Sequence, residues 1–224
     1  MNKEGQMLEN NNLPMISRQV LRSHFSRIAA LVVAVVCLVG IPSSAMSEDS
    51  VGSVHSLQGS ATAVRNELAR DLSVRSGVFL NDLITTRTSS KMAINIGPQT
   101  RVFLGEDTEL VIDEFILEAG GVLDFSRGAF GFDRPETATP MPMEIRTKFG
   151  RIGVRGTRFF AGRSNGVFSV FVDRGRVEVT AGGVSRPLTA GQGVDIPAPG
   201  QPPSQVKNWG EKRINEALQS VGMR

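Results

Sequence analysis

The sequence predicts an all-β fold of short stacked strands, arranged as a β-solenoid or a sandwich. Short apolar or alternating runs recur from residue 51 to residue 196, and each is closed by Gly, Asn, Asp or Ser. Apolar residues at helical spacing are absent until the C-terminal end. A composition of 40% hydrophobic and 21% charged residues is typical of globular domains and excludes a disordered or collagen-like polymer.

The N-terminal 45 residues have the pattern of an export signal. Residues 28–41 (IAALVVAVVCLVGI) are apolar, follow a basic stretch and precede small residues at Ser43 and Ala45. This run is shorter than the roughly 20 residues of a membrane-spanning helix. We therefore predict a signal peptide over residues 1–45, cleaved before Met46, with an uncleaved anchor as the alternative. The expected location is the periplasm, or the periplasmic side of the inner membrane if the anchor is retained.

The exported part is close to electrically neutral and poor in catalytic residue types. From Met46 onward it holds 21 basic and 20 acidic residues, which argues against a nucleic-acid partner. Cleavage before Met46 would remove the only cysteine, Cys37, and with it any disulfide or thiol chemistry. His55 is the only histidine of this part, and we expect it to be solvated.

Within the predicted β domain, residues 51–197, the pattern indicates a hairpin and two loops. Residues 166–180 alternate on both sides of Gly175, which predicts a hairpin that turns there. Residues 135–142 and 197–203 are proline-rich and should be loops, because proline cannot donate to a central strand ladder. The first of these is expected to divide two lobes of the domain.

After a proline-rich linker at residues 198–204, the pattern predicts a C-terminal helix over residues 205–222. Ser204 is in position to cap it. We expect the helix to pack on its own β domain, with Trp209 fastening it there, and a partner-binding helix is the alternative. Its apolar face would be formed by Ile214, Ala217, Leu218 and Val221.

Four segments carry a family resemblance. Residues 77–86 (GVFLNDLITT) are similar to the G-x-x-L-x-x-x-D-x-I-x-T segment of FecR domains. Residues 147–159 (TKFGRIGVRGTRF) resemble the family's T-x-x-G-x-x-x-V-R-G-T-x-F signature. Residues 170–177 (VFVDRGRV) resemble its V-x-V-x-x-G-x-V hairpin, and residues 188–192 (LTAGQ) its L-x-A-G-Q/E close.

This resemblance implies an all-β periplasmic domain used for signalling or binding rather than for chemistry. The name-giving members are iron-uptake regulators, which also have a cytoplasmic anti-sigma domain and a membrane helix. Here at most 27 residues precede the apolar run, too few for a folded sigma-binding domain. The implied subclass is therefore a stand-alone exported FecR-domain protein, not the anti-sigma regulators themselves.

A basic span between Glu144 and Ser164 is the candidate binding site. Strand alternation places Arg151 and Arg155 on the same face of one strand. It likewise places Arg146 and Lys148 on the same face of another strand. Guanidinium groups grip carboxylates, sulfates and phosphates through paired N–H donors, so an anionic glycan or a lipid head group is a plausible ligand. The candidate residues are Arg146, Lys148, Arg151, Arg155, Arg158 and Arg163.

An acidic run offers another interpretation of these charges. Six acids lie between residues 106 and 118, and ion pairs between this run and the basic span would be structural, worth about 0.2–1 kcal/mol each. The run lacks the spacing of a calcium loop. We predict no metal site and no cofactor.

Together these observations predict a non-enzymatic periplasmic module that binds an envelope protein or a glycan. Two other functions remain open. One is a carbohydrate-active enzyme of β-solenoid type, which would use Asp, Glu, Arg and Lys. The other is a membrane-tethered regulatory subunit, which requires residues 28–41 to be retained.

Overall fold

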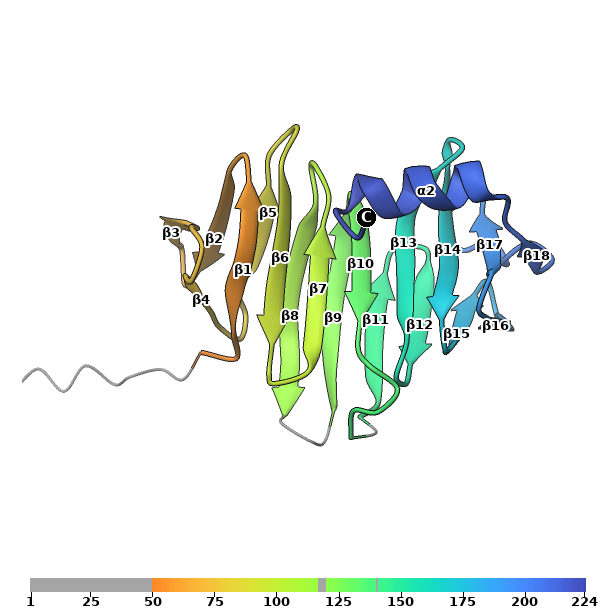
Figure 1. The fold of residues 1–224 in the computed structure, drawn as a ribbon, viewed down its shortest axis with the longest axis horizontal. Coiled ribbons are helices and arrows are strands. Elements are labelled where there is room, and N and C mark those ends of the chain that lie inside the picture. Colours follow the sequence, from red (N-terminus) through yellow and green to blue (C-terminus); the bar gives the residue numbers. More distant parts are fainter. Residues whose placement is uncertain (1–49, 117–119, 140) are drawn as a thin grey trace, which may run out of the picture. The chain divides into compact units, whose positions relative to one another are not determined.

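The described residues form two nine-stranded sheets and one short helix, so the all-β prediction is confirmed for this part of the chain (Figure 1). The computed structural model describes residues 50–116, 120–139 and 141–224, and the predicted signal segment lies outside them. No helix in the described ranges has the length and apolar character needed to span a membrane.

Sheet A has the last strand of the chain, β18, at one edge and β4 at the other. All of its neighbouring strands are antiparallel. Its order is β18 (Lys207–Asn208), β17 (Gln192–Ile196), β14 (Val167–Arg174), β13 (Arg158–Ser164), β10 (Ala129–Asp133), β7 (Thr100–Leu104), β6 (Lys91–Ile96), β1 (Gly52–Gln58) and β4 (Gly77–Val78).

Sheet B is built from the remaining strands. Its one parallel pair joins β9 and β11, with Met143 opposite Gly121. Its order is β16 (Val184–Thr189), β15 (Arg176–Ala181), β12 (Gly150–Val154), β11 (Met143–Thr147), β9 (Gly120–Arg127), β8 (Glu109–Ile116), β5 (Leu83–Thr86), β2 (Ala61–Arg65) and β3 (Leu68–Asp71).

The chain changes sheets after every one or two strands and so advances along both sheets together. The two sheets stay open at their edges and do not close into a barrel. Of the two architectures that the sequence predicts, the structure has two stacked sheets, and a solenoid is not confirmed.

The core lies between the sheets, where alternate residues of each strand point inward. In β10 and β13, Phe130, Phe132 and Phe159 are fully buried, with ring centroids 5.6–6.5 Å apart. Burying one such side chain stabilises the fold by about 1.5–3 kcal/mol. The two-residue period seen in the sequence therefore identifies the inward positions.

The predicted hairpin at residues 166–180 is wrong, because β14 lies in sheet A and β15 in sheet B. Gly175 makes the crossing with a φ of 84°. A Cβ atom on Gly175 would lie 2.6 Å from the carbonyl oxygen of Gly156, which itself has a φ of 60° at the crossing from β12 to β13. The two crossings thus pack against each other, and the turn that the sequence indicates connects sheets rather than neighbouring strands.

The described residues of both proline-rich stretches form loops, as predicted. The first connects β10 to β11 and the second connects β17 to β18. The first does not divide two lobes, because β10 is flanked in sheet A by β7 and β13 without a break.

The C-terminal helix is shorter than predicted. Helix α2 (Glu211–Ser220) begins after Gly210, and within the stretch before it Lys207–Asn208 form β18. Ser204 does not cap the helix; its Oγ accepts a 3.0 Å hydrogen bond from the N–H of Asp195. The loop before the helix is thereby tied to β17.

Helix α2 packs on the outer face of sheet A, which confirms the preferred interpretation of this segment (Figure 1). Leu218 is fully buried, and Trp209 stacks on Phe171 with ring centroids 4.9 Å apart. Gly193 makes room for the Trp209 indole, since any Cβ atom there would overlap it. Trp209 therefore fastens the helix to the sheet as expected.

Asp82, in the first segment of family resemblance, is a fully buried carboxylate near the N-terminal edge of the sheets. It accepts two hydrogen bonds from Arg70 and one of 2.8 Å from the N–H of Phe79. The hydrogen bond to Asp82 raises the pKa of Arg70 above its ordinary value. These bonds hold β3 and the turn before β5 together.

Replacing Gly175 by alanine tests the packed crossing. Both the positive φ and the overlap with the Gly156 carbonyl oppose a Cβ atom at this position. We expect Gly175→Ala to destabilise the protein by about 3 kcal/mol and to lower Tm by about 6–12 °C in a thermal melt. Gly166→Ala is the matched control, because φ there is 82° but nothing lies within 4 Å of the added atom. Equal losses in the two variants would contradict a role for the contact between the crossings.

Removing the Asp82 carboxylate tests the buried ion pair. Because the Arg70 side chain is 32% exposed and can be rehydrated, we expect Asp82→Ala to cost about 2–3 kcal/mol, less than a fully buried pair. Glu109→Ala, which breaks an exposed pair with Arg127, should cost about 0.2–1 kcal/mol. Urea denaturation of both variants measures the difference, and similar midpoints would show that burial adds nothing at Asp82.

Candidate functional site

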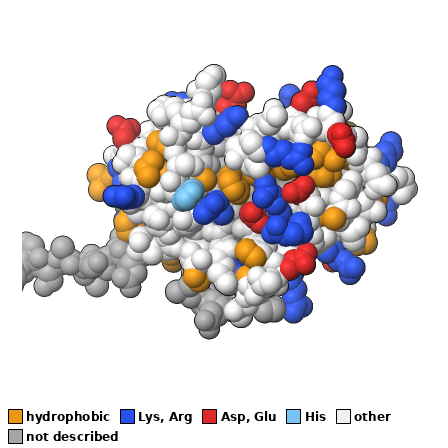
Figure 2. All heavy atoms as spheres, in the orientation of Figure 1, with side chains coloured by type: hydrophobic (Ala, Val, Ile, Leu, Met, Phe, Trp, Pro, Cys, Tyr) orange, Lys and Arg blue, Asp and Glu red, His pale blue; other side chains and the backbone are white. Residues whose placement is uncertain are grey.

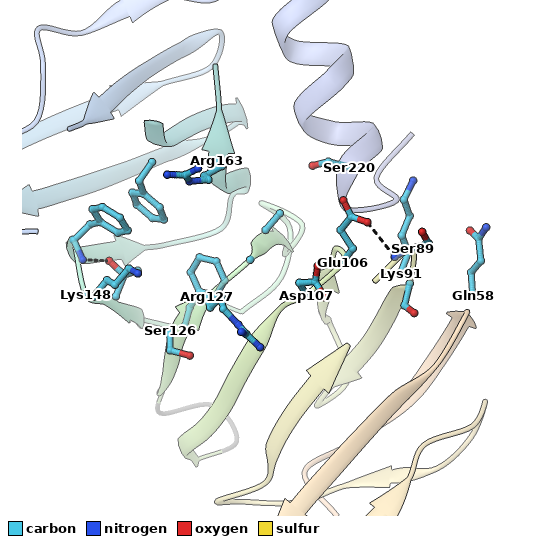
Figure 3. Close-up of a pocket in the computed structure, with 17 residues that line it drawn as sticks. Gln58, Ser89, Lys91, Glu106, Asp107, Ser126, Arg127, Lys148, Arg163 and Ser220 are labelled. Carbon is cyan, nitrogen blue, oxygen red and sulfur yellow. Dashed lines mark hydrogen bonds between the residues drawn. The ribbon is translucent and has the colours of Figure 1, made fainter. Parts of the chain in front are cut away.

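A pocket of about 750 Å³ opens at one end of the two sheets (Figure 3). The connections from β5 to β6, from β7 to β8 and from β9 to β10 cross between the sheets there, and they line one part of it. The hairpins β11–β12 and β13–β14, each within a single sheet, line the other part. The last residue of α2, Ser220, also reaches the pocket.

Aromatic rings form an apolar part of this end pocket. Phe149 stacks on Phe168 with centroids 4.3 Å apart and planes 6° from parallel, and Phe125 lies 6.3 Å from Phe168. Phe125 and Phe168 are buried, and the turn between β11 and β12 brings Phe149 over them. The result is a rigid apolar wall next to polar groups, as is common in small-ligand sites.

Basic side chains surround these rings. Lys148 lies with its Nζ 5.4 Å from the centroid of Phe149, and Arg163 and Lys91 also line the pocket. Within the described part of the chain, none of these three forms an ion pair, whereas Arg127 is held by Glu109 at 2.8 Å. Three cations are therefore available to an anionic ligand.

Two acids lie on the other side of the end pocket from Lys148 and Arg163 (Figure 3). Glu106 Oε2 accepts a 3.0 Å hydrogen bond from the N–H of Ser89, and Asp107 Oδ1 accepts one of 3.0 Å from Thr88 Oγ1. Both acids thus hold the β5–β6 connection in place. They come from one loop and do not face each other across the pocket, unlike the carboxylates that flank a scissile bond in glycosidases.

Only two of the six predicted site residues, Lys148 and Arg163, meet at this pocket. Arg146 and Arg151 lie together on the outer face of sheet B, where both pair with Glu144, at 2.9 and 3.9 Å. Arg146 also pairs with Asp113 at 3.2 Å. The hydrogen bond to Glu144 raises the pKa of Arg146.

Arg155 and Arg158 lie elsewhere. Arg155 lines a small pocket of about 200 Å³ beside Gly156. Arg158 pairs with Asp133 at 3.3 Å and with Asp173 at 3.1 Å, and it donates a 2.6 Å hydrogen bond to the carbonyl of Met223. The basic span is therefore distributed over four places, and basic and acidic side chains are interspersed on the face drawn in Figure 2.

The six basic residues do not form one surface, but the predictions about the exposure of single residues agree with the structure. Arg151 and Arg155 are both exposed, but Arg155 lies just beyond the end of β12; His55 is exposed, as expected. Of the acidic run, Asp113 pairs with the basic span, whereas Glu109 pairs with Arg127 outside it. Charge pairing thus accounts for Arg146 and leaves Lys148 and Arg163 available.

Sequence reasoning missed Arg134, which is only 5% exposed. Its guanidinium donates hydrogen bonds to Thr100 Oγ1 at 2.8 Å and to the carbonyl of Thr139 at 2.7 Å. Burial lowers its pKa. Nothing in the sequence around Arg134 indicates that it is buried. Phe149 was also missed, but it adjoins Lys148 in the signature segment and could have been noticed.

Among the described residues, no cluster of His, Cys, Asp and Glu could hold a metal ion.

Comparison with known proteins gives a family and a fold. The family model described as "FecR protein" matches residues 82–178. None of the curated proteins matches the chain. Two crystal structures, at 1.65 and 2.50 Å, of a "putative anti-sigma factor" from Parabacteroides distasonis share the fold with a TM-score of 0.51 each and identities of 18% and 17%. Each match covers 60% of this chain and 63% of that one, so the chain spans less than two thirds of the protein it resembles.

Proposed function

The chain contains a FecR domain, and from this we propose that it is a regulatory binding module of the cell envelope that acts without catalysis. A signalling role fits both the domain and the fold shared with a protein described as an anti-sigma factor. The proposed partner is an envelope protein or an anionic glycan. The proposed location is the periplasm, on the pattern of residues 1–45.

The observation that carries this proposal is the end pocket. Its stacked Phe149 and Phe168 offer an apolar wall, and beside it stand Lys148 and Arg163, which form no ion pair with any described residue. Such a site favours a ligand with an apolar ring face and an attached carboxylate, sulfate or phosphate. Sugar rings that carry acidic substituents have both features, so an anionic glycan is the first ligand to test.

Reversing both pocket charges tests the proposal. We expect Lys148→Glu combined with Arg163→Glu to weaken binding of soluble peptidoglycan fragments or oligogalacturonate at least about ten-fold, because two charge-assisted contacts are lost. Isothermal titration calorimetry measures the affinity. Arg176→Glu, at an exposed cation outside the pocket, is the matched control and should bind as the unmodified protein does.

Two outcomes would contradict this assignment. If Arg151→Glu combined with Arg155→Glu abolishes binding while the pocket variant retains it, the site lies at one or both of these arginines, outside the end pocket. If the pure protein releases new reducing ends from these glycans, the module is an enzyme.

The mass of the native protein tests the proposed location. We expect a soluble periplasmic species that begins at Met46, because the apolar run is short and is followed by small residues at Ser43 and Ala45. Intact-mass spectrometry of separated periplasm and membranes measures this. A membrane-bound species that keeps residues 28–41 would favour a tethered regulatory subunit.

A further inference from the structure

The small pocket at the Val-Arg-Gly-Thr turn contains a buried cation that pairs with no carboxylate of the described residues. Arg134 is 5% exposed, and its two hydrogen bonds go to a neutral hydroxyl and a neutral carbonyl. Within the described residues, no carboxylate pairs with it. Neutral partners satisfy N–H groups but do not balance a buried charge, and arginine is seldom this buried unless it is paired.

Arg134 is held firmly at this position. Its backbone N–H donates a 2.9 Å hydrogen bond to the carbonyl of Thr157, which is fully buried in the signature segment. The side-chain bonds to Thr100 and Thr139 fix the guanidinium between β7 and the β10–β11 loop. An anion that entered the pocket would therefore meet an ordered donor group and would lose little affinity to its reorganisation.

A second cation lines the same pocket. Arg155 is exposed and forms no ion pair within the described chain. Gly156 and Glu136 also line the pocket, and Glu136 is the only acid among its lining residues. With Arg134 and Arg155 opposed by Glu136, the lining carries a net charge of +1, which matches one carboxylate better than a dianionic phosphate.

We propose that Arg134 and Arg155 form a binding site for a single carboxylate of a partner protein, the side chain of an aspartate or glutamate. The volume of about 200 Å³ is below the roughly 300–1,000 Å³ of small-molecule sites and suits one side chain. The planar guanidinium group binds a carboxylate through paired N–H donors. This site is separate from the end pocket and goes beyond the function proposed above.

The test uses the peptide acetyl-Gly-Glu-Gly-amide as the probe. In nuclear magnetic resonance spectra of the purified protein, we expect it to shift the Nε–H signal of Arg134 in a saturable way. The matched peptide with Gln in place of Glu should leave the signal unchanged. Arg155→Gln should weaken binding about two- to five-fold, and Glu136→Gln should strengthen it by a similar factor, because both are exposed charges.

Three results would overturn the proposal: equal effects of the Glu and Gln peptides, no change in affinity in either exposed variant, or tighter binding of inorganic phosphate than of the Glu peptide. Arg134→Gln should abolish the peptide's effect, and the two exposed variants decide the question if that variant fails to fold. Lys148→Glu combined with Arg163→Glu should bind the peptide unchanged, so failure at this site and failure at the end pocket are distinguishable.

Discussion

The contact between Gly175 and the Gly156 carbonyl is the constraint on which the C-terminal half of the fold depends. The chain passes from sheet B to sheet A at Gly156 and returns at Gly175, and both residues have positive φ angles. Because Gly175 has no Cβ atom, the two crossings can lie directly against each other. This close approach brings β13 and β14 over β12 and β15, and the intervening phenylalanines fill the space between the sheets.

The connections between strands also decide where the two pockets form. Some connections cross between the sheets, and others turn back within one sheet. The end pocket lies where these two kinds of connection meet, and the hairpin β11–β12 brings Lys148 and Phe149 to it. The smaller pocket lies beside the Gly156 crossing, where the β10–β11 loop buries Arg134. Both sites therefore follow from the connections rather than from the strands.

Much of the fold could be predicted because it depends on local periodicity. The two-residue alternation identifies inward residues such as Phe130 and Val170, and the helical spacing of Leu218 and its neighbours identifies the packed face of α2. Local periodicity could not tell whether the two runs on either side of Gly175 form a hairpin. A glycine turn between two alternating runs has the same local pattern whether the second run pairs with the first or enters the facing sheet. The pairing of β15 with β12 and β16 decides it.

For the candidate site, too, local sequence patterns predict some features and tertiary contacts decide the others. By itself the sequence determined the all-β FecR domain and a basic span beside the Val-Arg-Gly-Thr turn, because apolar patterning, glycine turns and charge are local properties. Only the tertiary structure decided that Lys148 and Arg163 share a pocket, that Arg158 holds the C-terminal segment and that Arg134 is buried. These facts depend on contacts between residues far apart in the chain. No short stretch of sequence records which distant strand or loop will cover a given side chain.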